Sequence, residues 1–131
     1  MSLDTALYGI LTGASTITAI VGTRISPVHD PEVGETRDRL IYQQVAGPRD
    51  HDCTGPSLAR GYYQITAWSA THAGADTLCE AVRVLFKDGY RSGTVMGVFI
   101  RGQGDIPSLD TDEAATQYGK YLEIELVLKE T

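Results

Sequence analysis

The stretch that decides the fold of this chain is Gly61-Tyr62-Tyr63-Gln64-Ile65-Thr66-Ala67-Trp68, which runs almost directly into residues 73–87. The first part predicts a strand, because aromatic and β-branched residues favour an extended backbone. The second part predicts an amphipathic helix, since Leu78, Val82 and Leu85 recur at helical spacing. A strand followed at once by a helix that packs back on the same sheet is the nucleus of an α+β domain.

Outward from this nucleus, the chain alternates between periodic segments and glycine- or proline-rich breaks. Two short helices are expected first, ending at Gly13 and Gly22, and residues 24–28 are extended. Strands are expected at residues 39–46, 61–68, 94–100 and 121–129. Loops are expected at residues 29–38, 47–57 and 103–119. We predict a single domain over residues 1–131, α+β in class and two-layered. It has a mainly antiparallel four-stranded sheet, a long helix packed on one face and the order α-(α)-β-β-α-β-β.

The two faces of this sheet are unusually alike in the strand at residues 61–68. Tyr63 lies on one face, while Tyr62 and Trp68 lie on the other. An antiparallel sheet with one face in water should show a polar side. We therefore expect the helices of the chain to cover one face and a neighbouring subunit to cover part of the other.

Composition excludes several classes of protein. The chain has 131 residues, and such a length buries about two-thirds of its unfolded surface. Its net charge of −6 and the absence of a basic stripe argue against a protein that grips nucleic acid along its surface. Residues 102–131 alone hold seven acidic residues against two lysines. We find no secretory signal and no apolar run long enough to span a membrane.

No grouping of reactive residues predicts an enzyme, a metal site or a cofactor. His51-Asp52-Cys53 places three ligand types together, but a zinc site needs a second pair. Cys79 is expected on the packed side of its helix, where a thiol is inert, and Cys53 has no catalytic signature around it. A single disulfide between Cys53 and Cys79 is one interpretation of the sequence, and we favour the other, in which both are reduced thiols of a cytosolic chain.

Two further patterns have plainer explanations. The segment 110–113 resembles the start of a calcium loop, but it lacks the central glycine and the final glutamate. Tyr42, Tyr62, Tyr63 and Trp68 could stack on nucleic-acid bases. The acidic balance of the chain and the lack of neighbouring lysines instead favour packing in the core or at an interface.

Several stretches resemble the tail-completion and tail-terminator family, which are tail-to-head joining proteins of long-tailed phages and gene transfer agents. The turn after the first helices, the first strand, the second strand with its turn, and the helix all carry the resemblance. These stretches are Ile20-Val21-Gly22-Thr23-Arg24-Ile25-Ser26-Pro27, Leu40-Ile41-Tyr42-Gln43-Gln44-Val45-Ala46-Gly47, Leu58-Ala59-Arg60 with Gln64-Ile65-Thr66-Ala67-Trp68-Ser69-Ala70-Thr71, and Ala75, Leu78, Ala81, Val82 and Leu85. The resemblance covers about the first ninety residues.

The resemblance implies a structural virion protein without enzymatic activity. Such a protein caps the tail tube as a homo-hexameric ring, stops tail growth and forms the tail side of the head–tail junction. Its partners are then its own copies, the tail tube protein and a head-side connector protein. DNA passes through the lumen without specific binding, and no membrane is involved. Assembly takes place in the host cytoplasm.

Two sets of residues are candidates for these roles. We expect Arg60, Tyr62, Gln64 and Trp68 at a subunit interface, with Arg60 paired to an acid of the next chain. We expect some of Asp105, Asp110, Asp112 and Glu113 to line or border the channel, because like charge keeps DNA phosphates from binding. The alternative for this acidic loop is that it simply points into solvent.

Three other functions remain open from the sequence. One is a head-side stopper or adaptor of the same particle. Another is a small enzyme or ligand-binding domain on a similar scaffold, since a fold does not fix a function. The last is an interaction module unrelated to phages.

Overall fold

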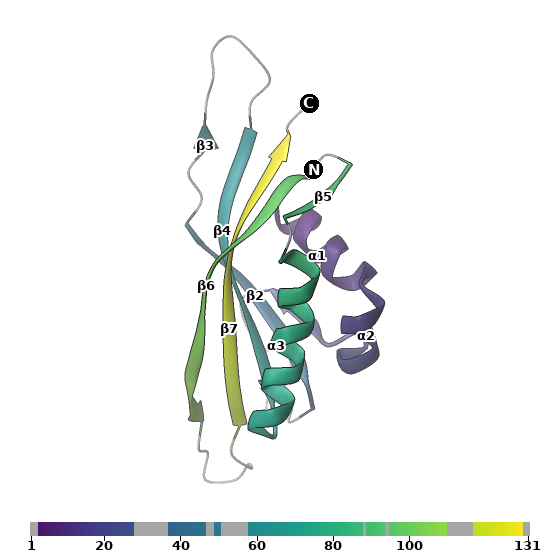
Figure 1. The fold of residues 1–131 in the computed structure, drawn as a ribbon, viewed down its shortest axis with the longest axis vertical. Coiled ribbons are helices and arrows are strands. Elements are labelled where there is room, and N and C mark those ends of the chain that lie inside the picture. The colour runs from purple at the N-terminus through teal and green to yellow at the C-terminus, as the bar shows by residue number, and fades with distance from the viewer. Residues whose placement is uncertain are drawn as a thin grey trace.

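The computed structural model describes residues 3–27, 37–46, 49–50, 58–87, 89–93, 95–109 and 117–129. The helices are α1 (Leu3–Gly13), α2 (Ser15–Val21) and α3 (His72–Phe86). The strands are β1 (Ile25–Pro27), β2 (Arg39–Ala46), β3 (Arg49–Asp50), β4 (Leu58–Ser69), β5 (Tyr90–Ser92), β6 (Val95–Leu109) and β7 (Gln117–Lys129). In Figure 1 the three helices lie together on one side of a strongly twisted, curled sheet.

The sheet is larger than the sequence predicts. Its strand order is β1-β2-β4-β7-β6-β5, with β3 added beside β4. β1 runs parallel to β2, and the other pairs are antiparallel. The predicted two-layer fold, with a mainly antiparallel four-stranded sheet and a long helix, is therefore wrong. The sheet is seven-stranded and mixed, and α3 shares the cover of its inner face with α1 and α2.

The largest error concerns residues 103–109, which we expected in a loop. β6 continues through them because β7 offers a long partner strand, and aromatic rings fill the space that the glycines leave. A Cβ atom on Gly104 would lie 2.7 Å from the hydroxyl oxygen of Tyr121 on β7. In the same way, a Cβ on Gly119 would lie 2.8 Å from the ring of Trp68 on β4.

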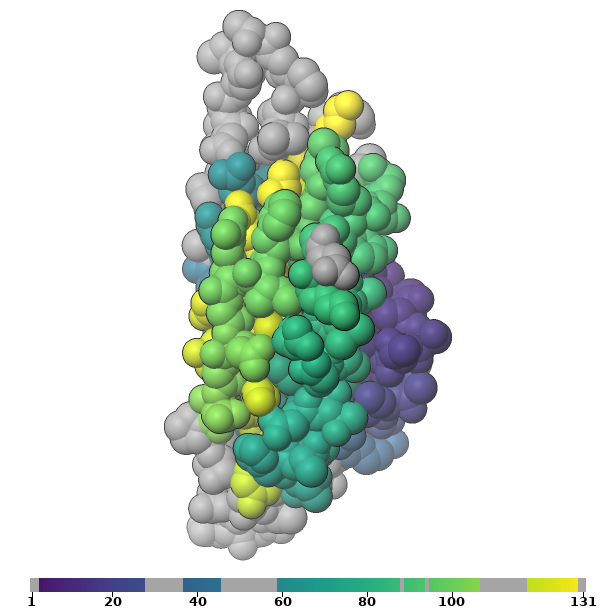
Figure 2. All heavy atoms as spheres, viewed as in Figure 1, coloured from purple at the N-terminus to yellow at the C-terminus, as the bar shows by residue number. Residues whose placement is uncertain are grey.

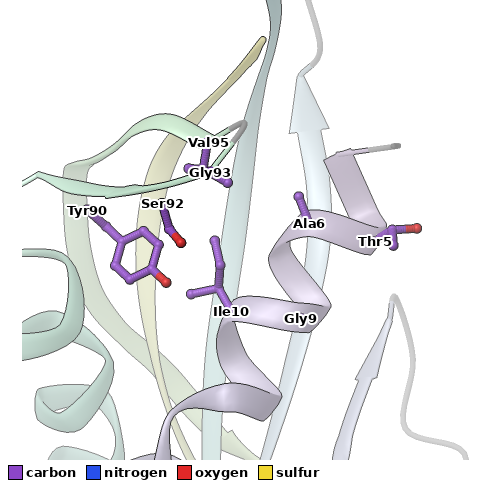
Figure 3. Close-up of a pocket in the computed structure, with 8 residues that line it drawn as sticks. All are labelled: Thr5, Ala6, Gly9, Ile10, Tyr90, Ser92, Gly93 and Val95. Atoms are coloured by element: carbon purple, nitrogen blue, oxygen red, sulfur yellow. The ribbon is translucent and has the colours of Figure 1, made fainter. Parts of the chain in front are cut away.

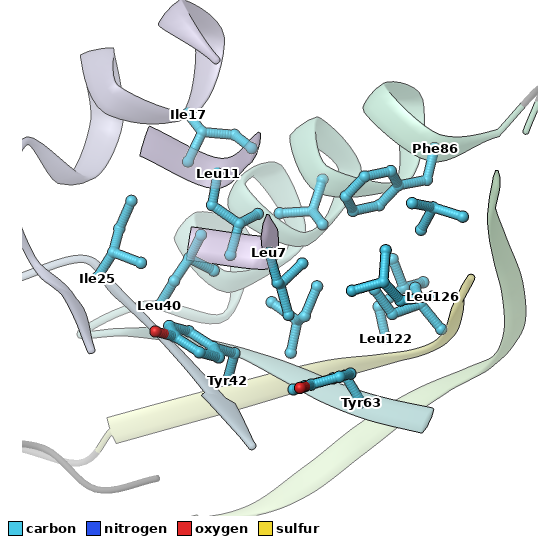
Figure 4. Packing of buried hydrophobic residues seen from close by; sticks show 14 of the residues in the cluster. Leu7, Leu11, Ile17, Ile25, Leu40, Tyr42, Tyr63, Phe86, Leu122 and Leu126 are labelled. Carbon is cyan, nitrogen blue, oxygen red and sulfur yellow. The ribbon is translucent and has the colours of Figure 1, made fainter. Parts of the chain in front are cut away.

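The core lies between the helices and the inner face of the sheet (Figure 4). Leu7 and Leu11 of α1 and Phe86 of α3 lie in this core beside residues of β7. The alternation of apolar residues along 121–129 predicts which residues of β7 face the core, and this is confirmed, because all four are fully buried: Leu122, Ile124, Leu126 and Leu128. The packed side of α3 is also confirmed, and Thr71 caps this helix by accepting a hydrogen bond from the Gly74 amide at 3.0 Å.

One polar contact ties the first helix to the centre of the sheet. The hydroxyl of Tyr63, a fully buried residue of β4, donates a hydrogen bond of 2.5 Å to Asp4 of α1. Burial, together with this bond, raises the pKa of Tyr63 far above its usual value. The hydroxyl therefore stays protonated and donates to Asp4 at neutral pH.

The described helices give no candidate for a membrane span. Each is too short, or not apolar enough, to cross a bilayer.

Candidate functional site

The sheet face turned away from the helices carries the candidate site. We call it the outer face and define it by residues on three central strands: Arg60, Tyr62, Gln64 and Trp68 of β4, Glu123 and Glu125 of β7, and Phe99 and Arg101 of β6. No described helix packs on this face (Figure 1). All four residues predicted at a subunit interface share it, because alternate residues of β4 point to the same side.

At the centre of the outer face, one acid holds two arginines. Glu125 is only 4% exposed. One of its carboxylate oxygens lies 3.0 Å from Nε of Arg60, and the other accepts a hydrogen bond of 2.8 Å from Nε of Arg101. The two arginines come from strands on either side of β7, so this group joins β4, β7 and β6.

This arrangement differs from the partner that the sequence suggested for Arg60. The sequence argument paired Arg60 with an acid of a neighbouring chain, whereas in the structure Arg60 forms an ion pair with Glu125 of the same chain. Glu123 lies on the same face, so the two arginines of the outer face are matched by two glutamates. Whether the same residues also contact another copy stays a prediction.

Aromatic rings, glycines and arginines lie side by side on the outer face. The Trp68 ring covers Gly119, and the Arg39 guanidinium lies 5.7 Å from the centre of that ring. Toward the other margin, Phe99 is 44% exposed and lies beside Arg101. Aromatic residues and arginine are enriched at protein interfaces, and both types are exposed on this face.

The acidic candidates lie elsewhere. Asp105 is exposed and pairs in register with Lys120, on the helix side of the sheet. It is therefore not on the outer face with Arg60 and its neighbours. Asp110, Asp112 and Glu113 lie outside the described residues, as do His51, Asp52 and Cys53.

Near Asp105, a group of charged residues fastens the start of α3 to the sheet. Ligand atoms of His72, Asp76 and Asp105 lie within 4.8 Å of one another. The Lys120 ammonium donates a hydrogen bond of 2.7 Å to Asp76, and this bond lowers the pKa of Asp76 and raises that of Lys120. An ammonium thus already occupies the carboxylate that a bound cation would need, so we describe the group as an ion-pair cluster.

The described hollows of the surface hold no arrangement for catalysis. One of about 330 Å³ lies between α1 and the β5–β6 turn (Figure 3). Its described lining is small, apolar or hydroxylic: Thr5, Ala6, Gly9, Ile10, Tyr90, Ser92, Gly93 and Val95. Cys79 lies elsewhere, buried on α3, and burial raises the pKa of its thiol. A buried thiol with a raised pKa is a poor nucleophile at neutral pH.

Sequence reasoning missed Glu125, Arg101 and Phe99. The alternation of β7 placed Glu125 on the side facing away from the core, which is correct, but gave no sign of its burial. Phe99 was within a predicted strand, and Arg101 lay just after its expected end. Only the register of β6 on β7, with Phe99 opposite Glu125, brings these residues together.

Comparison with known proteins informs the fold and the family. A search of curated proteins finds no match. Among solved structures, a chain from the "virion of native gene transfer agent (GTA) particle" has a similar fold, with a TM-score of 0.62 and 20% identity. The similarity covers 98% of this chain and 96% of that one.

The match at the level of families is more informative. Residues 5–113 match the family described as "Tail completion protein gp17". These residues contain α2, α3 and nearly all of α1, together with every described strand except β7. The chain therefore belongs to the tail completion protein gp17 family, a family of structural tail proteins and not of enzymes.

Proposed function

We propose that this protein caps the end of a phage-type tail tube as a homo-hexameric ring. The ring ends tail growth and forms the tail side of the head–tail junction, with DNA passing through it. Membership of the tail completion family supports this role, and so does the similar fold of a chain from a gene transfer agent virion. The observation that carries the proposal is the outer face, where exposed aromatic and arginine side chains have no described helix over them.

The proposal is tested by mixing the purified protein with tail tubes and, separately, with portal complexes. Electron microscopy should show a ring at one end of each tube, and capped tubes should no longer elongate with added tube protein. Protein that binds portal complexes and leaves the tubes bare would instead identify a head-side stopper or adaptor. A mass measurement in dilute solution does not test the proposal, because a ring whose assembly needs the tube as template would be absent without the tube.

Within this ring, the outer-face residues Arg60, Tyr62, Gln64 and Trp68 contact the neighbouring subunit. Arg60→Glu should abolish rings on tubes, because it reverses the charge beside Glu125 and at the contact. This change also places two carboxylates together within one chain, so a second variant is needed. Gln64→Arg adds charge to the same face without altering the contacts of Glu125.

The matched control is Val84→Arg, which adds an arginine at a 49% exposed position on α3, away from the sheet. We expect Gln64→Arg to lose rings and Val84→Arg to keep them, with similar unfolding midpoints for both isolated subunits. If Arg60→Glu and Gln64→Arg both form normal rings, the outer face is not part of the subunit interface.

We further propose that the acidic residues border the channel. Asp105 is exposed, and the sequence places Asp110, Asp112 and Glu113 in the segment between β6 and β7. Replacing all four by lysine should slow DNA ejection severalfold or trap DNA, because added cations bind phosphates and release counterions.

A neutral variant, with asparagine and glutamine at these four positions, separates charge from shape and should slow ejection much less. The retardation by lysine should also weaken as salt is raised. Ejection rates and infectivity that are unchanged by four lysines would contradict a place beside the channel.

A further inference from the structure

The sheet has one margin where β6 continues without a neighbour. β5 pairs only with the start of β6, between Val95 and Val98. Beyond this point, no described residue pairs with the side of β6 opposite β7. Residues 102–106 lie between two irregularities and pair regularly with β7, so they form a segment of ordinary strand length whose other side pairs with no described residue. Figure 2 shows β6, in light green, at the surface beside α3.

At the opposite margin, the part of the chain that the structure describes leaves a second unpaired edge. β1 pairs with β2 over Leu40–Tyr42 and ends at Pro27, which has no amide hydrogen to donate, and no described residue pairs with the same side of residues 43–46. β2 continues past this point through residues 43–46. A hollow of about 420 Å³ lies where β1 stops, lined by Asp4, Pro27, Tyr42, Gln43 and Gln44.

We propose that residues 102–106 of β6 pair with residues 43–46 of β2 in the next copy, so that the sheet continues from subunit to subunit. This inference rests on the proposed ring and names its contact. The occupant is a second copy because one chain offers both halves of the contact. Two different edges make a head-to-tail contact, which is the kind that closes into rings.

The side chains along the two edges agree with such pairing. Proteins whose edge strands must not pair with another chain commonly carry lysine on those strands. Residues 102–106 and 43–46 contain no lysine, and Asp105, the charged residue among them, already faces Lys120. Like charges would therefore not oppose each other across the contact.

An exposed apolar residue lies within the proposed contact. Val45 of β2 is 49% exposed. Pairing with β6 of the next copy would cover part of this side chain.

Cysteine cross-linking tests this contact. Gln103 pairs with Leu122 and Gln44 pairs with Tyr63, so both glutamines lie on the helix side of the sheet. Gln44→Cys and Gln103→Cys would thus project to the same side in a continued sheet, and a disulfide needs Cα atoms within about 7 Å. The experiment uses the full chain with Cys53→Ser, while Cys79 is retained because it is only 3% exposed.

Oxidation of the double variant on tail tubes should give a ladder of covalent oligomers on a non-reducing gel. The control pair Gln44→Cys with Val84→Cys should stay monomeric. Rings without a ladder would overturn the edge pairing and leave the proposed function intact. No rings on tubes, even for the unmodified protein, would overturn both. Covalent dimers from Gln103→Cys alone would show that two β6 edges meet, which also contradicts the proposal.

Discussion

Replacing both Arg60 and Arg101 by methionine should lower the free energy of unfolding by about 3 kcal/mol, because it leaves the carboxylate of Glu125 buried without a cation. Glu125 is 4% exposed, whereas the side chains of Arg60 and Arg101 are 35% and 55% exposed. Water can solvate an arginine that loses its partner here, but it cannot reach the glutamate. Removing the acid should therefore cost less than removing the two bases.

A three-part comparison checks this asymmetry by chemical denaturation of the isolated subunit. Glu125→Leu alone should lower the free energy of unfolding by about 1 kcal/mol. The triple variant, with Arg60→Met, Arg101→Met and Glu125→Leu, should regain most of the stability that the double arginine variant loses. The reason is that a buried group of charges can be replaced by apolar residues at little cost. If the double variant unfolds at the same denaturant concentration as the unmodified protein, Glu125 is solvated and the group on the outer face adds no stability.

Tyr63→Ala should be the second strongly destabilising change, with a loss of about 3–5 kcal/mol, as is typical when a buried aromatic residue is truncated. The ring is fully buried among the residues that join α1 to β4 (Figure 4). Tyr63→Phe keeps the ring and removes only the hydrogen bond to Asp4. Because Asp4 is exposed and can be hydrated, this variant should lose only about 1 kcal/mol.

The measurement is again denaturant unfolding, and Tyr42→Phe serves as a control, since it also removes a hydroxyl from a largely buried tyrosine of the same core. Equal losses for Tyr63→Phe and Tyr63→Ala would mean that the hydrogen bond, and not the ring, holds α1 on the sheet. A small loss for Tyr63→Ala would mean that α1 contributes little to the stability of the domain.

The elements that could be predicted from the sequence are those whose pattern is local. α3 shows apolar residues at helical spacing, and β7 shows strict alternation, so each was recognisable without its partners. The four interface candidates also share one face, because alternation alone places alternate residues of β4 together. These inferences need only the geometry of a single helix or strand.

The remaining elements depend on partners that the sequence does not reveal. β5 is only three residues long, and pairing with β6 defines it. The segment after Ile100 reads as a loop because it contains glycines and an acid, yet pairing with β7 makes it part of the sheet, where the Tyr121 ring lies over Gly104. Glu125 reads as a surface charge until strand register brings arginines to it from both sides.

The pairing of rings with glycines has a consequence for how this sequence can vary. Trp68 and Gly119 share one volume, as do Tyr121 and Gly104, although the partners lie far apart in the chain. A larger residue in place of either glycine has no room unless the ring across from it shrinks at the same time. Each pair should therefore be inherited as a unit, and substitutions that arise singly at the glycines should be purged while compensated double changes persist.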